Sequence, residues 1–239
     1  MGYDMRMVND PTDQSLLKTR RGTFYAAVKA RDALPKHERG NIDPATFQSP
    51  SFDFDDHSAW VGRTPRYAAA QDAVCEASRM VDNADAGYFC LNIWGMSLCR
   101  QIMAEHNMLA DGGHPLWPEA KDFDATSDEI DEWYDKIYYP EDGEVAEPPP
   151  NVAAYFDALK AVKCYHPEGT TGVPTFKLCS NDGWVVTSDE CRQAVDAWNA
   201  SGAGIPTRIE DGKEVEVTWW PEWVDYMSRA ADHGGFYVR

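Results

Sequence analysis

Residues 180–184, with the sequence SNDGW, form the densest polar cluster in the chain. Adjacent hydroxyl, amide and carboxylate groups can hold a small ligand or move a proton, and functional side chains favour loops on rigid elements. Asn181 and Asp182 are therefore candidate ligand-binding residues. The cluster also suits a tight turn, with Asn and Asp in a type I turn and Gly183 in the left-handed position. Both interpretations place Asn181 and Asp182 at the tip of a loop.

Four further residues complete a candidate pocket around this loop: Asn92, Trp94, Trp184 and His233. With Asp182 or His233 as acid or base, the pocket would belong to a small-molecule binder or a hydrolase-like enzyme. Structural alternatives exist for two of them. Asn92 can be a hydrogen-bonded amide buried in an apolar strand, and His233 can oppose the dipole at the C-terminal end of a helix.

Asp53, Asp55 and His57 alternate along the stretch DFDDH and form the candidate metal site. In an extended segment they face one way, and carboxylate oxygens with an imidazole nitrogen can bind a cation. A solvated acidic loop is the interpretation that we favour, so no cofactor is expected. The sequence has no P-loop, GxGxxG or HExxH motif, and the spacing of Cys164 and His166 matches no zinc framework.

The elements around the polar cluster must position it. Alternation of Phe176 and Leu178 with polar residues predicts a strand, and 184–186 returns beside it to complete a β-hairpin. Thr187, followed three residues later by Glu190, predicts a capping box that starts an amphipathic helix.

Helical and strand patterns also alternate along the rest of the chain. Helices are predicted at 23–34, 66–82, 95–109, 126–138, 152–162 and 221–233, and strands at 3–8, 87–93, 215–217 and, as a sheet edge, 236–238. Irregular segments are predicted at 35–65 and in the acidic, Pro-rich stretch 140–150. The pattern predicts a single α+β domain over residues 1–239, in which about six helices cover a small, largely antiparallel sheet of about five short strands.

The formal net charge is −18, and residues 119–147 hold twelve acidic residues against two lysines. Such a surface repels nucleic-acid phosphates, which argues against a nucleic-acid binder. No apolar run reaches membrane-spanning length, and the start lacks the apolar segment of a signal peptide. We therefore expect no membrane association, a cytoplasmic location and six reduced cysteines.

Acidic and aromatic residues supply the candidate interface. Asp128, Asp131 and Glu132 represent the acidic part, for which a solvated face is the alternative. Trp219 and Trp220 are adjacent and point to different sides, so one of them is expected at the surface, where tryptophan anchors interfaces. A protein partner is therefore predicted, without an identity.

Four segments of the chain resemble a family of uncharacterised proteins from actinobacteria and their phages. They are MGYDM at the start, YFCLNIWGM at 88–96, KLCSNDGWVVT at 177–187, and WWPEW with ADHGGF within 219–236. The resemblance leaves out 35–65 and 119–150. It implies an intracellular protein, is compatible with a phage-encoded one in the host cytoplasm, and transfers no catalytic residue. We favour a non-enzymatic interaction or accessory protein, host-directed if phage-encoded, over the small-molecule alternative.

Overall fold

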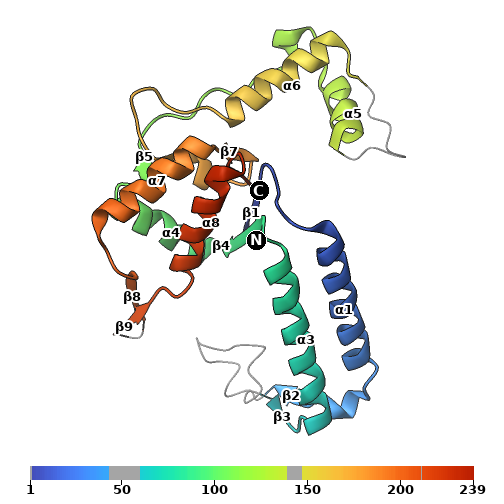
Figure 1. Cartoon of the computed structure of the whole chain (residues 1–239). Coiled ribbons are helices and arrows are strands. Elements are labelled where there is room, and N and C mark those ends of the chain that lie inside the picture. Colours follow the sequence, from blue (N-terminus) through green and yellow to red (C-terminus); the bar gives the residue numbers. More distant parts are fainter. Residues whose placement is uncertain (1, 43–59, 139–146, 211) are drawn as a thin grey trace. The chain divides into compact units, whose positions relative to one another are not determined.

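The computed structural model describes residues 2–42, 60–138, 147–210 and 212–239 (Figure 1). The chain divides into two compact units, Pro11–Tyr88 and the remainder, Met1–Asp10 with Phe89–Arg239. We call them the hairpin unit and the sheet unit. The predicted α+β class is confirmed, with helices and a mainly antiparallel sheet. A single domain stays a prediction.

Four short strands form the sheet. Their order is β4 (Tyr88–Asn92), β1 (Gly2–Met7), β10 (Phe236–Val238) and β7 (Trp184–Val186). β10 pairs antiparallel with both β1 and β7, with Met5 opposite Val238 and Phe236 opposite Val186. The prediction that 236–238 forms a sheet edge is therefore wrong, because β1 and β7 occupy both of its sides.

Each of the four segments quoted for the resemblance contains residues of one strand of this sheet, the last of them only Phe236 of β10. The segment that ends in GGF also needs its second glycine. Gly235 has φ +90°, and a Cβ on it would lie 1.9 Å from the carbonyl oxygen of Val186. A structural reason therefore exists for this glycine, since a side chain there would collide with the neighbouring backbone.

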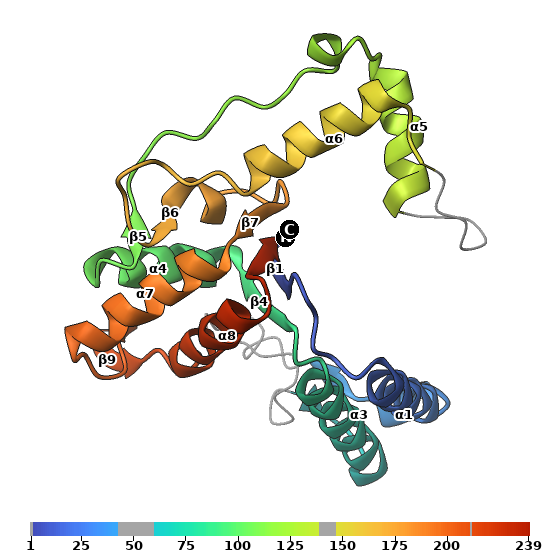
Figure 2. The ribbon, with the colours of Figure 1, turned by 45° about the horizontal axis from the view of Figure 1, so that its top comes forward.

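Three helices complete the core of the sheet unit: α4 (Ile93–Glu105), α7 (Ser188–Ser201) and α8 (Trp220–Asp232). α7 and α8 pack along each other (Figure 2). The capping box predicted for α7 is confirmed, with Thr187 and Glu190 as its two members. The largest fully buried side chains of the sheet unit include Met5, Met7, Trp220, Trp223, Tyr226 and Phe236.

The predicted hairpin before α7 is wrong. Residues Thr175–Leu178 form a 3-10 helix after β6 (Val173–Pro174), which pairs in parallel with β5 (Leu109–Ala110). The strand pattern required Lys177 to face solvent, but its side chain is completely buried. The left-handed backbone predicted for Gly183 is confirmed, at φ +77°, but its loop connects the 3-10 helix to β7.

Helices α5 (Ser127–Tyr138) and α6 (Pro150–Lys163) belong to the sheet unit and share a small second core with the 3-10 helix Ala120–Phe123. Ala125, Ile130 and Val152 are its buried members. A second capping box begins α5: the backbone N–H of Thr126 donates to Glu129 at 2.8 Å, and that of Glu129 donates to the Thr126 hydroxyl at 3.2 Å.

An exposed β-hairpin of the sheet unit consists of β8 (Thr207–Glu210) and β9 (Lys213–Glu216). The prediction found only its second strand, at 215–217. Every residue of the two strands that the structure describes is exposed, so burial gave no apolar alternation for the sequence to reveal.

Two long helices, α1 (Gln14–Asp32) and α3 (Pro65–Ala84), pack together in the hairpin unit. α1 begins well before the predicted residue 23, because the Asp13 carboxylate caps it by accepting from two backbone N–H groups. Thr12 connects the segment before α1 with the segment after α3: its hydroxyl donates to Asp85 at 3.2 Å and accepts from the Gly87 N–H. The unit also contains the 3-10 helix Lys36–Glu38 and the paired strands β2 (Asn41–Ile42) and β3 (Trp60–Val61).

Candidate functional site

The 180–184 turn is held by its own polar side chains. The Ser180 hydroxyl donates to Asp182 at 2.6 Å and accepts from the indole N–H of Trp184 at 3.1 Å. The Asn181 amide donates to the carbonyl oxygen of Gly2 at 2.7 Å, which fastens the turn to β1. The interpretation of this cluster as a tight turn therefore accounts for its hydrogen bonds. The side chains of Asn181 and Asp182 are nevertheless exposed.

Asn181 and Asp182 also line a hollow of about 680 Å³ in the sheet unit. The cations of its lining are Lys160, Lys163 and Arg239; the carboxylates are Asp157 and Asp182; apolar and aromatic members include Phe156, Leu159, Val185 and Tyr237. Its size is that of a small-molecule site, typically about 300–1,000 Å³. We call it the cation-lined hollow.

Lys163 is the best-buried cation of this lining. Burial lowers its pKa, the positive charge of Arg239 lowers it further, and Asp182 opposes both. A Cβ on Gly183 would lie 3.2 Å from the Lys163 Nζ, so the glycine leaves room for the ammonium beside the turn. The hollow therefore offers a partly desolvated positive charge next to the residues predicted from the sequence.

A buried ionic network, which the sequence did not predict, contacts the backbone of Val185 and Thr187 in the lining of the hollow. Lys177 (0% exposed) donates to both carboxylate oxygens of Glu190 (2% exposed), at 2.7 and 2.9 Å, and to the carbonyl oxygen of Val185 at 2.7 Å. Glu190 also accepts from the backbone N–H of Thr187, and His166 Nδ1 lies 2.9 Å from one of its oxygens.

Desolvation lowers the pKa of Lys177, and Glu190 opposes that shift. Because Val185 and Thr187 line the hollow, this network fixes its wall. The Lys177 ammonium itself does not reach solvent, so it positions the backbone and does not act on a ligand. The only sequence signal was the capping-box role of Glu190, since a lysine between two apolar residues looks like an ordinary exposed charge.

The other predicted pocket residues do not join the hollow. Asn92 is an exposed N-cap whose side chain accepts from the Gly95 N–H at 2.7 Å, so its expected burial as a strand amide is wrong. Trp94 is 83% exposed, whereas Trp184 is buried. His233 ends α8, and its backbone oxygen accepts from Asn9. Neither this hollow nor the one between α7 and α8 gathers these side chains with Asp182.

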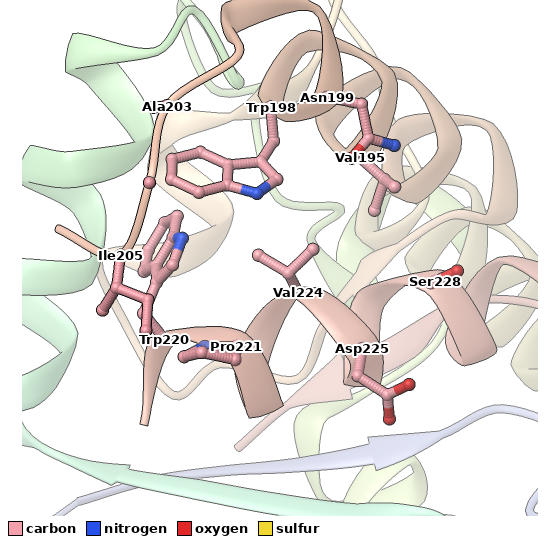
Figure 3. Close-up of a pocket in the computed structure, with 11 residues that line it drawn as sticks. Val195, Trp198, Asn199, Ala203, Ile205, Trp220, Pro221, Val224, Asp225 and Ser228 are labelled. Carbon is pink, nitrogen blue, oxygen red and sulfur yellow. The ribbon is translucent and has the colours of Figure 1, made fainter. Parts of the chain in front are cut away.

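A second hollow, of about 550 Å³, lies between α7 and α8 (Figure 3). Trp198 and Trp220 pack edge to face in its wall with ring centroids 5.1 Å apart. Trp220 is buried, and its indole N–H has no hydrogen-bond partner in the part of the chain that the structure describes. Of the two tryptophans expected at an interface, Trp219 is therefore the one that reaches solvent.

The acidic interface candidates lie on the outer face of α5. Asp128, Asp131 and Glu132 are all exposed, as is Asp135. Their spacing of i, i+3, i+4 and i+7 places them on one stripe, opposite Ile130, which packs in the second core. Among the described residues, Glu132 pairs with Lys136, whereas the three aspartates have no ion-pair partner. We call these four residues the acidic stripe.

All six cysteines are free thiols. Cys99 and Cys191 are buried, and burial raises the pKa of both. Cys90 and Cys179 are exposed. The candidate metal ligands Asp53, Asp55 and His57 lie outside the described residues. Elsewhere, within the ranges that the structure describes, no cluster of three or more His, Cys, Asp and Glu side chains could hold a metal ion.

Comparisons with known proteins leave the site without a precedent: no family model, curated protein or solved structure matches the chain. Among the described residues, no helix has both the length and the apolar character needed to cross a membrane. The function of the protein must therefore be inferred from its own residues.

Proposed function

We propose that the protein is a non-enzymatic interaction protein that binds a basic protein partner through the acidic stripe of α5. The observation that carries the proposal is the arrangement of the stripe: four exposed carboxylates on one face of a helix whose other face is used for packing. Location in the cytoplasm, and a host-directed role if the chain is phage-encoded, belong to the same proposal.

Helix energetics support a role for the stripe. Asp128 and Glu132, and likewise Asp131 and Asp135, are like charges at i,i+4, which destabilise a helix by about 0.2–0.5 kcal/mol per pair. Lys136 is the one cation that offsets them within the described part of α5. A partner with basic side chains would remove this repulsion, and complementary charge also accelerates association.

Exposed aromatics provide the second element of the proposal. Trp94 and its neighbour Ile93 stand on the first turn of α4, 83% and 50% exposed. Tryptophan supplies a large share of the binding energy at protein interfaces when a partner covers it. Trp94 is therefore the first aromatic to test as an anchor.

The stripe can be tested with two charge-matched variants in pull-downs from a lysate of the source cell. One variant neutralises the stripe as Asp128→Asn, Asp131→Asn, Glu132→Gln and Asp135→Asn. The control neutralises four exposed glutamates elsewhere in the sheet unit, as Glu210→Gln, Glu214→Gln, Glu216→Gln and Glu222→Gln. Both lose the same charge, so a specific interface responds to the first variant alone.

We expect the wild type and the control to retain the same basic protein, and the stripe variant to lose it. The interaction should also weaken in 1 M salt, where the screening length falls to about 3 Å. Identical bound proteins for all three chains, or none for any, would contradict the proposal. Trp94→Ala tests the anchor separately and should weaken capture without changing its salt dependence.

A further inference from the structure

The side chains that line the cation-lined hollow carry a net positive charge, although the chain as a whole is strongly negative. In a protein of formal charge −18, its side chains comprise three cations and two carboxylates. Among the described residues, Lys160, Lys163 and Arg239 make no ion pair within 4.0 Å; Arg239 lies over the ring of Tyr237 at 5.1 Å. Asp157 and Asp182 also line the hollow, but among the described residues neither forms an ion pair with these three cations.

Lys163 makes the strongest case for a missing partner. Its side chain is half-buried and donates no hydrogen bond to any described residue. Removing an ammonium from water without a partner is unfavourable, and a bound anion would compensate it. A Cβ on Gly183 would lie 3.2 Å from its Nζ, so the charge lies directly beside the turn.

The helix dipole explains only part of the cluster. Lys160 and Lys163 occupy the last turn of α6, where cations are favourable against the negative helix end. Arg239 follows β10, far away in sequence, and it faces the same space. The dipole therefore accounts for two lysines at a helix end, but not for a third cation from another element or for the burial of Lys163.

We infer that the cation-lined hollow binds a small molecule that carries a phosphate group on an apolar or aromatic body. The phosphate would lie between Lys163 and Arg239, since Arg and Lys are the usual donors to phosphate oxygens. The body would lie against Phe156, Leu159 and Tyr237 in the lining. Asp157 and Asp182 leave a side-chain excess of a single positive charge, which suits one compact phosphate better than a polyanion such as nucleic acid.

Phenyl phosphate is a suitable probe, because it combines the two features in one small molecule, and benzyl alcohol provides the uncharged comparison. Binding can be measured by calorimetry with the full chain at pH 7.5. Lys163→Met removes the central charge and keeps the aliphatic stem, and Arg239→Gln removes the second charge. Lys213→Met, on exposed β9, is the matched control for the loss of one positive charge.

The wild type and Lys213→Met should bind phenyl phosphate saturably, and Lys163→Met and Arg239→Gln should each bind it about tenfold more weakly, as expected for one charge-assisted hydrogen bond. Absence of binding to the wild type at millimolar probe, equal binding by Lys163→Met, or equally tight binding of benzyl alcohol would each overturn the inference.

Amine labelling gives a second readout that does not depend on the variants folding. Because its pKa is lowered, Lys163 in the wild type should react with acetic anhydride faster than exposed Lys213, and phenyl phosphate should slow the reaction of Lys163 but not that of Lys213. Equal protection of both lysines, or of neither, would overturn the site. Neither assay involves the acidic stripe, so failure here leaves the proposed protein interface untouched, and the reverse also holds.

Discussion

Replacement of Lys177 by methionine tests whether the buried network stabilises the sheet unit. The change removes three hydrogen bonds of 2.7–2.9 Å and leaves Glu190 as a carboxylate that is 2% exposed. Removal of one partner from a buried ion pair typically costs about 3–5 kcal/mol. Glu190 keeps its hydrogen bonds to the Thr187 N–H and His166, so we expect a loss near the lower end, about 3 kcal/mol.

The double variant Lys177→Met with Glu190→Gln distinguishes the loss of stability caused by breaking the ion pair from the loss caused by poorer packing. Glutamine can still accept the Thr187 N–H but carries no charge, so no unpaired ion stays buried. We expect Glu190→Gln alone to cost about as much as Lys177→Met, because it strands the buried ammonium. The double variant should cost at least about 1.5 kcal/mol less than the sum of the two single variants.

Urea unfolding followed by tryptophan fluorescence is the appropriate assay, because eight of the nine tryptophans belong to the sheet unit and only Trp60 to the hairpin unit. Lys213→Met should stay within about 0.5 kcal/mol of the wild type, as for an ordinary surface change. If the effects of Lys177→Met and Glu190→Gln add to within about 0.5 kcal/mol, the two groups are not coupled and the reasoning is refuted.

Three further predictions concern backbone and capping. Gly235→Ala should destabilise the sheet unit by about 3 kcal/mol or more in the same urea assay. The control Gly202→Ala, at φ +62° with open space around it, should cost only about 1 kcal/mol. Equal losses of stability in the two variants would contradict the steric explanation. Asn92→Ala should cost about 1 kcal/mol through loss of the α4 cap, and Asn92→Asp should restore it; no difference between the two would argue against capping. Hydrogen bonds from Thr126 lower the pKa of Glu129 from 4.5. The contribution of the Glu129 carboxylate to the stability of α5 is therefore complete above pH 4.5 and is lost as the pH falls through the lowered pKa. Helical circular dichroism should therefore fall more on acidification in the wild type than in Glu129→Gln, which keeps the cap without titrating, and equal titration curves would refute the assignment.

Local features could be predicted from the sequence by itself. The capping box of Thr187 with Glu190, the final helix and the strand at the start are confirmed, and the same T-x-x-E spacing occurs in the capping box of α5. These features depend on residues three or four positions apart, or on a simple alternation, so the chain carries their whole signal. The loop position of Asn181 and Asp182 follows from the same short-range chemistry.

Tertiary structure decided everything that depends on distant residues. The partner of β7 is β10, not the segment before it, and Lys177 is buried because Glu190 and Val185 meet its ammonium there. A lysine that looks exposed in the sequence can be accommodated inside only when the fold supplies a charge and a carbonyl for it. The exposure of Trp94 likewise has no sequence signal.

The candidate site divides in the same way. The sequence indicated Asn181 and Asp182, because Asn, Asp and Gly in succession are typical of a turn. Lys163 and Arg239 lie on other elements and belong to no sequence motif. Their convergence follows from the packing of α6 and from the pairing of β10 with β7 beside the turn. Types and spacing of residues determined where a loop would present polar groups, and only the fold determined which charges would face them.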